Sequence, residues 1–277
     1  MLKNSILDQR LGEAEASVVC NVLVTRLGGS YSRLLGIKLA GMESDESFKW
    51  FVASVLLGSP VRATSALAAY RMLESHGLLD PRRLAAVDEA VLAESLLDAG
   101  VTGYTRRIAG TLRLAVESMV NDYDADINRL HFFAEDANDL IARMRRLGRK
   151  VPCRAVNLFL REMRGVWEKA HPGLSGAAVE AARCLGIVDE GVAVGEAEDE
   201  LRGVWERASR ADRTYADFEV ALVRLGENYC EMRRCIVCPM GKLCISRTND
   251  VKERLCPDMT STTGGRDRTP AERTARR

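Results

Sequence analysis

The sequence predicts an all-α protein, and three observations lead to this prediction. Apolar residues recur at steps of three and four along most of the chain, as in "FKWFVASVLL" and "RRIAGTLRLAVESMV", which is the spacing of one helix face. The alternation of apolar and polar residues that indicates strands is nearly absent. Glycines and prolines stand between the periodic segments, as helix ends require. About ten helices of roughly 10 to 18 residues fit this pattern.

The breaks between the expected helices follow one another along the chain. A helix that ends near Leu57 is followed by "GSP", and "GLLDP" precedes a helix that starts near Arg82. Gly100 and Gly103 bracket a turn before "YTRRIAGTL", because glycine favours turn conformations. The acidic segment 189–200, with its two glycines, is interpreted as a loop and a helix start.

Composition indicates a soluble globular protein. The chain has 277 residues, 47% apolar and 29% charged, with a net charge of +1, and this length allows two lobes. Its apolar stretches are shorter than the roughly 20 residues of a membrane span, and "MLKNSILDQRLGEAE" lacks a signal peptide's apolar core. We therefore expect a cytoplasmic protein, nucleoid-associated in a prokaryote, with no membrane partner. Residues 258–277, basic and almost free of large apolar residues, are expected to form a disordered tail.

Four of the eight cysteines lie in "YCEMRRCIVCPMGKLC", at the spacing C-x4-C-x2-C-x5-C. They are Cys230, Cys235, Cys238 and Cys244. In a reducing compartment such clusters are more often metal or redox groups than disulfides, and four thiolates suit either zinc or a [4Fe-4S] cluster. One continuous short loop favours the [4Fe-4S] cluster, because structural zinc sites usually combine two separate close pairs. Zinc and unliganded thiols remain alternatives.

The other cysteines stand singly in the sequence. They are Cys20, Cys153, Cys184 and Cys256. We expect them to act as small hydrophobic residues.

A second unusual segment is basic. No acidic residue occurs between Asp139 and Glu162. The basic residues there are Arg143, Arg145, Arg146, Arg149, Lys150, Arg154 and Arg161. Solvated helix faces usually mix both signs, so this run suggests a phosphate-bearing partner, although a solvated face remains the alternative.

The segment "DFEVALVRLGENYCEMRRCIVCPMGKLC" resembles the end of the endonuclease III branch of the helix-hairpin-helix DNA glycosylases. There, a helix with a Leu-Gly pair runs into a four-cysteine [4Fe-4S] loop, although this chain has four rather than six residues in the first gap. "FKWFVASVLLGSPVRATSALAAYRMLESHGLLDPRRLA" and "LLDAGVTGYTRRIAGTLRLAVESMVNDYDADINRL" are similar to the family's opening helices. "RMRRLGRKVPCRAVNLFLREMRGVW" falls where the DNA-binding hairpin belongs.

The resemblance implies two helical lobes with DNA between them. A six-helix barrel lobe over 45–155 would face an iron-sulfur lobe made of 1–44 and 156–257. A monomer would bind double-stranded DNA across the cleft and flip one base out of the duplex. The expected phosphate-contacting residues are Arg149, Lys150 and Arg154 near the hairpin and Arg233, Arg234 and Lys242 in the cysteine loop.

Two departures from the family concern catalysis. The lysine that forms the Schiff base falls on Arg154, and a guanidinium stays protonated, so we expect no Schiff-base lyase activity. The catalytic aspartate falls on Ser175, a good helix N-cap that cannot carry the aspartate's negative charge. His171 and Glu168 are further candidates for its role.

The main hypothesis is a DNA N-glycosylase that releases a modified or damaged base by hydrolysis. A relative that has lost catalysis and recognises DNA structure or lesions is the alternative, and a redox protein with a protein partner is a third. The base cannot be assigned from the sequence, because pocket shape decides it.

Overall fold

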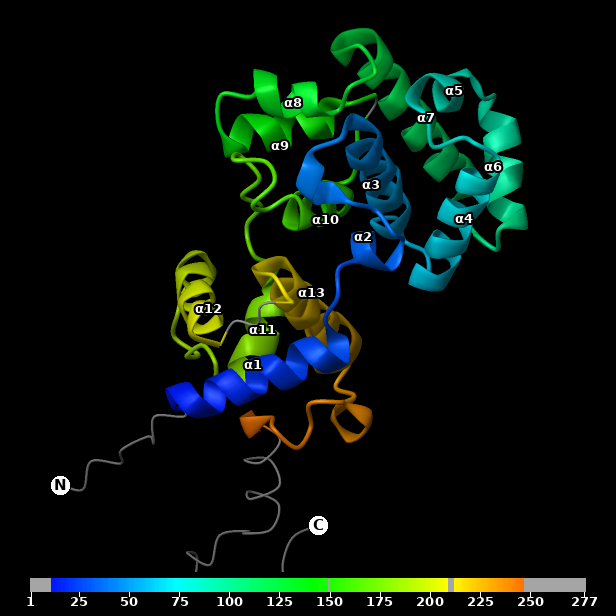
Figure 1. Ribbon diagram of the computed structural model, residues 1–277. Coiled ribbons are helices and arrows are strands. Elements are labelled where there is room, and N and C mark those ends of the chain that lie inside the picture. Colours follow the sequence, from blue (N-terminus) through cyan, green and yellow to red (C-terminus); the bar gives the residue numbers. More distant parts are fainter. Residues whose placement is uncertain (1–10, 149, 209–211, 247–277) are drawn as a thin grey trace, which may run out of the picture.

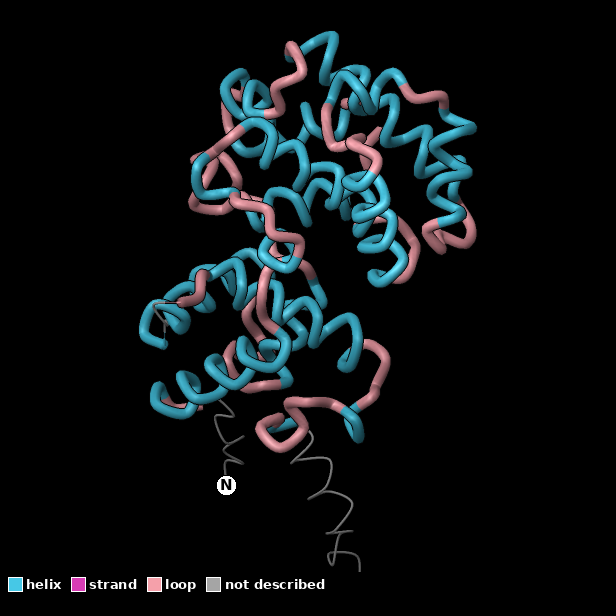
Figure 2. The backbone as a smooth tube through the Cα atoms, turned by 45° about the vertical axis from the view of Figure 1, so that its right-hand side comes forward, coloured by secondary structure: helices cyan, strands magenta, loops and turns pink. Residues whose placement is uncertain are grey.

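The computed structural model describes residues 11–148, 150–208 and 212–246. In these ranges every regular element is helical and no strand occurs, as Figure 2 shows. The predicted all-α class is therefore confirmed. None of the described helices is long and apolar enough to cross a membrane. The tail expected over 258–277 lies outside the described residues.

Buried apolar side chains form two clusters. The first cluster runs from Ile37 to Ala170, so it extends beyond the expected range 45–155 at both ends. Its helices lie in the upper part of Figure 1. They are α2 (Tyr31–Leu34), α3 (Ser44–Leu57), α4 (Ala63–Ser75), α5 (Pro81–Ala86), α6 (Glu89–Asp98), α7 (Thr105–Tyr123), α8 (Asn128–Phe133), α9 (Ala137–Arg146) and α10 (Cys153–Glu162), with a 3-10 turn, η1 (Leu39–Gly41).

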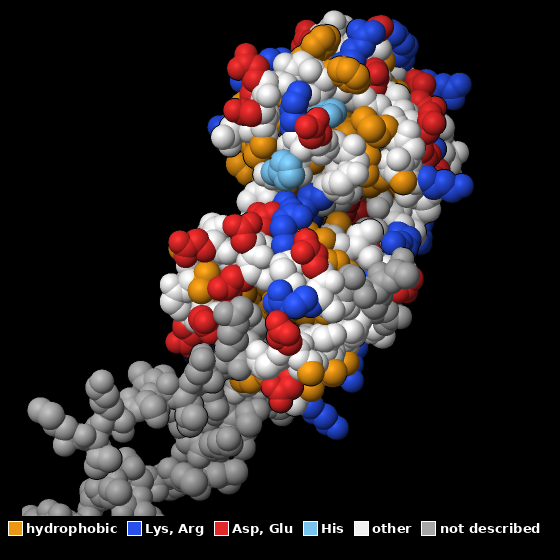
Figure 3. All heavy atoms as spheres, turned by 60° about the vertical axis from the view of Figure 1, so that its left-hand side comes forward, with side chains coloured by type: hydrophobic (Ala, Val, Ile, Leu, Met, Phe, Trp, Pro, Cys, Tyr) orange, Lys and Arg blue, Asp and Glu red, His pale blue; other side chains and the backbone are white. Residues whose placement is uncertain are grey.

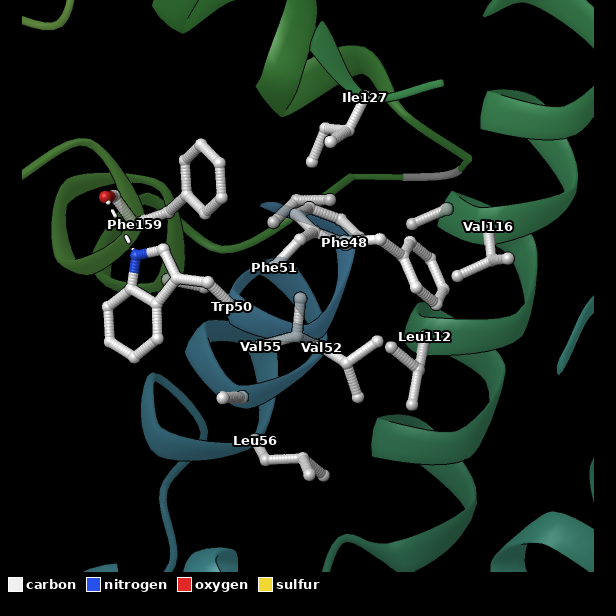
Figure 4. Close-up of a cluster of buried hydrophobic side chains, with 14 of the residues drawn as sticks. Phe48, Trp50, Phe51, Val52, Val55, Leu56, Leu112, Val116, Ile127 and Phe159 are labelled. Atoms are coloured by element: carbon white, nitrogen blue, oxygen red, sulfur yellow. Dashed lines mark hydrogen bonds between the residues drawn. The ribbon is translucent and has the colours of Figure 1, made fainter. Parts of the chain in front are cut away.

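Helix α3 is the centre of the first cluster. Its sequence "WFVASVLL" is buried throughout, as expected for a helix that is apolar on all sides. It packs against α4, α7 and α10. The Trp50 indole Nε1 donates a hydrogen bond of 3.1 Å to the Phe159 carbonyl, and Phe51 meets the Phe159 ring edge-on at 6.1 Å. Figure 4 shows these side chains between α3, α7 and α10.

The second cluster joins one N-terminal helix to the C-terminal part of the chain. Helix α13, which is almost entirely buried, packs against α1 and α11. The elements are α1 (Glu13–Leu27), α11 (Gly176–Cys184), α12 (Val194–Ala208), α13 (Tyr215–Leu225), the π-helix η2 (Gly226–Cys230) and the 3-10 turn η3 (Cys235–Val237). In the described part of the chain, the backbone passes between the clusters at 28–30 and at 171–173.

The predicted helix breaks agree with the structure. Helix α3 ends at Leu57 and α5 begins at Pro81. Gly100 and Gly103 both have positive φ, 84° and 83°, where glycine has no steric penalty. The expected length range is missed by one residue for α11, which has nine, and for α7, which has nineteen. It is wrong for α2, α5 and α8, which have four to six residues. Local caps support such short helices, as where the Asp80 carboxylate accepts the backbone N–H of Arg83 in α5.

Buried ion pairs join the two clusters at α10 and α13. The Glu219 carboxylate is 0% exposed. Its oxygens lie 3.0 Å from Arg161 Nε and 3.0 Å from Arg164 Nε. Arg164 also pairs with Glu198 of α12 at 2.6 Å and donates to the Pro172 carbonyl. One carboxylate therefore connects the end of the first cluster to helices of the second.

Two further buried carboxylates stabilise the backbone near 28–30, the other place where the chain passes between the clusters. Glu162 accepts the backbone N–H groups of Tyr31 and Ser32 at 2.8 and 2.9 Å. Burial raises the pKa of Glu162, and these hydrogen bonds act against the rise. Asp217 accepts the N–H groups of Ser30 and Thr214 at 3.0 and 2.9 Å. Both carboxylates thus serve to fix the backbone between α1 and α2.

The substitution Glu219→Gln tests the buried ion pairs. It leaves two buried guanidinium groups facing a neutral amide, and breaking a buried pair costs about 3–5 kcal/mol. We expect the free energy of unfolding in urea to fall by about that amount. The control is Glu117→Gln, which removes the half-exposed partner of Arg113 and should change the free energy by less than about 0.5 kcal/mol. Equal effects of the two variants would contradict the assignment.

Candidate active site and cysteine loop

A cavity of about 690 Å³ lies between the two clusters. It is lined by side chains of α10 from the first cluster, and by side chains of α13, of η2 and of Ser175, the residue before α11, from the second. Figure 3 shows one face of the molecule, on which Lys and Arg side chains gather where the surface narrows between the two groups of helices. The cavity therefore depends on the way the clusters are joined.

The charged residues that line the cavity are mostly basic. They are Arg62, Arg154, Arg161, Arg224 and a single acid, Glu227. An Arg154 guanidinium nitrogen lies 2.9 Å from Glu227 Oε2, so this ion pair bridges α10 and η2 across the cavity. Arg161 is likewise paired with the buried Glu219, so Arg62 and Arg224 are the lining cations that favour an anionic ligand.

Arg224 and Tyr31 form another side of the cavity. The Arg224 guanidinium carbon lies 4.2 Å from the centroid of the Tyr31 ring, a cation–π arrangement. The same guanidinium donates to the carbonyls of Leu27 and Gly28 at 2.9 and 3.2 Å. These contacts fix the aromatic ring and the charge beside it.

The predicted catalytic candidates do not lie together. Ser175 lines the cavity, and its Oγ accepts the backbone N–H of Ala178 at 3.2 Å, so it caps α11 as predicted. His171 and Glu168 are exposed and are not among the residues that line the cavity.

The basic segment does not form a surface of one sign. Arg143 pairs with Asp139 at 2.7 Å, Arg154 pairs with Glu227, and Arg161 is buried against Glu219. Acidic residues from a distant part of the chain neutralise part of this basic segment, because folding brings Glu219 and Glu227 next to α10. Among the other expected DNA contacts, Lys150, Arg233, Arg234 and Lys242 are exposed. Arg149 lies outside the described residues.

The cysteine loop packs on the second cluster. Cys230 ends η2, and Cys230 and Cys238 contact the buried apolar side chains of this cluster. Cys235 is exposed, and Cys244 is partly buried. Backbone hydrogen bonds shape the loop, from Arg234 N–H to the Tyr229 carbonyl at 2.8 Å and from Gly241 N–H to the Cys238 carbonyl at 3.1 Å.

The expectation for Cys184 is wrong. It is not an isolated apolar residue, because it ends α11 beside the loop, where Cys244 Sγ lies 3.2 Å from its carbonyl oxygen. A hydrogen bond with the Cys230 thiol lowers the pKa of Cys184 to about 7. The role of a small hydrophobic residue expected for Cys153 is also wrong, since this thiol is exposed at the start of α10. Cys20 is buried, which raises its pKa to about 12. Cys256 lies outside the described residues.

The chemistry of the four loop cysteines fits an iron-sulfur cluster. Thiolates are the usual ligands of such clusters, and Cys230 lies close enough to Cys238 and Cys244 for electrostatic interaction. Within the described ranges, no three Cys, His, Asp or Glu side chains form a group that could hold a metal ion. The loop therefore supplies ligands of a suitable chemical type.

Glu227 is one of the lining residues that the sequence does not predict, together with Tyr31, Arg62 and Arg224. It follows Gly226, where a Cβ atom would lie 2.1 Å from the Ala177 carbonyl oxygen. This close approach sets the start of η2 against the first turn of α11, and π-helical turns occur frequently at functional sites. The Leu-Gly pair before the first loop cysteine was the available signal, because it marks close packing of the backbone.

No family model and no curated protein matches this chain.

The variant Gly226→Ala tests the packing of η2 on α11. The added methyl group would overlap the Ala177 backbone, and overpacking of this kind costs about 1–3 kcal/mol. We expect a matching loss in the free energy of unfolding. Gly176→Ala is the control, because no atom lies within 4 Å of its added Cβ and alanine favours the helix. A harmless Gly226→Ala would contradict the close approach.

Proposed function

We propose that the chain is a DNA N-glycosylase that hydrolyses the N-glycosidic bond of a modified or damaged base, without Schiff-base lyase activity. One observation carries the proposal. Arg154 and Ser175 align through separate motifs with the lysine and the aspartate of the glycosylase family. They line one cavity although Arg154 lies on a helix of the first cluster and Ser175 caps a helix of the second. An accidental resemblance gives no reason for these two positions to meet.

The cavity has the size and chemistry that a flipped nucleotide requires. Its volume of about 690 Å³ falls in the range of about 300–1,000 Å³ for small-molecule sites. Leu57, Leu158 and Val223 supply apolar surface, and Asn157 and Asn228 supply amide groups. A base that is held outside the duplex is recognised by stacking and by hydrogen bonds to its edge. The basic side chains suit the flanking phosphates.

The reaction follows from these groups. Water adds to the sugar C1′ as the N-glycosidic bond breaks, and the bonding electron pair leaves with the base, which takes up a proton. Positive charge develops on the sugar during this step. Arg154 stays protonated and cannot attack C1′ as an amine, so the product is an intact strand with an abasic site.

The proposal includes a [4Fe-4S] cluster on Cys230, Cys235, Cys238 and Cys244. When bound, the cluster would tie four points of the loop together, a structural contribution rather than a catalytic one. It would fix the loop segment that carries Arg233, Arg234 and Lys242, all exposed, for contact with DNA phosphates.

A DNA reader without catalysis is the second candidate. The observation that favours it is the hydrogen bond from the Ala178 N–H to Ser175 Oγ, because the aspartate position holds a capping hydroxyl without charge. The same cavity could then receive an extruded base and leave its glycosidic bond intact.

Base release is tested on a panel of duplexes, each with one modified, damaged or mismatched base. We expect one class of duplex to break only after alkali treatment, since hydrolysis leaves an abasic site in an uncut strand. Borohydride should trap no covalent adduct on abasic DNA, because Arg154 cannot form a Schiff base. Salt-sensitive binding without cleavage on any duplex would favour the reader, and a trapped adduct would refute the absence of lyase chemistry.

The cluster is tested by metal analysis of protein purified without oxygen. We expect about four irons and four sulfides per chain. Cys235→Ser should lower the iron content and the visible absorption, whereas Cys153→Ser should leave both unchanged. The two thiols are a matched pair, since both are exposed but only Cys235 lies in the loop. One zinc per chain, or equal iron in the two variants, would contradict the proposal.

A further inference from the structure

We infer that Glu227 is the catalytic carboxylate of the cavity and supplies the negative charge that Ser175 cannot. The inference rests on the proposed glycosylase function. The family resemblance places the central catalytic group at the start of α11. The inference assigns it to η2 instead.

The other carboxylates near the junction are already engaged. Glu162 accepts two backbone N–H groups, Asp217 accepts two and pairs with Arg33, and Glu219 pairs with two arginines. All three are buried. If any of these three carboxylates turned to a substrate, buried hydrogen-bond donors or charges would lose their partner, at a high cost in stability.

Glu227 differs in its surroundings. Its side chain is 36% exposed, and it is the acid among the residues that line the cavity. Its partner Arg154 lines the same cavity and is itself 64% exposed. The pair is therefore open to a ligand, and a bound sugar can meet the carboxylate without the loss of a buried contact.

The backbone places Glu227 close to the expected position of the aspartate. Gly226 lies against Ala177, two residues after Ser175 in the first turn of α11. Ser175 and Glu227 line the same cavity. We therefore assign to Glu227 of η2 the role that the family gives to an aspartate at the N-cap of α11.

The chemistry assigned to Glu227 is that of a general base and an electrostatic stabiliser. As the N-glycosidic bond breaks, its negative charge stabilises the positive charge on the sugar. It accepts one proton from the attacking water while the O–C1′ bond forms, and this proton is finally taken up by the departing base or by solvent. Arg154 holds the carboxylate in place as a positioning residue.

Glu227→Gln tests this assignment on the duplex that the wild type cleaves. The amide keeps the size of the side chain but carries no charge and cannot accept the proton. We expect the single-turnover rate of base release to fall about 10²–10⁴-fold, with DNA binding, iron content and thermal unfolding unchanged. Glu227→Asp should recover part of the rate. Glu231→Gln is the matched control, an exposed acid four residues further along the same segment, and it should cleave at the wild-type rate.

The outcomes separate the inference from the function on which it rests. Cleavage by Glu227→Gln at the wild-type rate would overturn the role of Glu227 and leave the glycosylase function standing. A parallel loss of rate, iron and thermal stability would also overturn it, because the residue would then be structural. If the wild type releases no base from any duplex, the glycosylase function and the inference fall together.

Discussion

The arrangement of the molecule depends on one buried carboxylate. Glu219 is removed from water on α13 and faces the guanidinium groups of Arg161 and Arg164. Because a buried charge without a partner is strongly unfavourable, the two hydrophobic clusters must meet in the one orientation that brings these groups together. Arg161 also lines the cavity. The interaction that joins the clusters therefore also forms part of the candidate active site, and the cavity has a fixed shape instead of being a gap between independent units.

The same constraint divides the acidic residues by role. Glu162, Asp217 and Glu219 are buried and hold backbone amides or arginines, so their charges are committed to the fold. Glu227 lies at the accessible end of the junction, where its charge is balanced by Arg154 but still open to solvent. Burial, more than residue type, thus distinguishes the three acids that stabilise the fold from Glu227, which is accessible to a ligand. A substitution scan that treated all four alike would confuse folding with chemistry.

The sequence predicted the features that depend on neighbouring residues. The end of α3 at Leu57, the start of α5 near Pro81 and the N-cap at Ser175 were predicted correctly, because a few adjacent side chains determine each one. Features that join distant segments were missed. Arg154 and Glu227 are 73 positions apart, and Cys184 and Cys244 are 60 apart. The sequence alone therefore predicts a uniformly positive run between 139 and 162, although the fold supplies its acids, and predicts an isolated apolar residue at Cys184.

The π-helix η2 connects the cavity to the cysteine loop. In a regular α-helix, residues three positions apart lie on the same face, so Glu227 and Cys230 would point in similar directions. The wider π-helical turn separates them. As a result, Cys230 packs against the second cluster while Glu227 lines the cavity. Gly226 permits this turn by allowing the backbone to approach Ala177. An iron-sulfur cluster bound to Cys230 would consequently also fix the backbone that carries Glu227. The cysteine loop would then determine the position of the carboxylate without taking part in the chemistry.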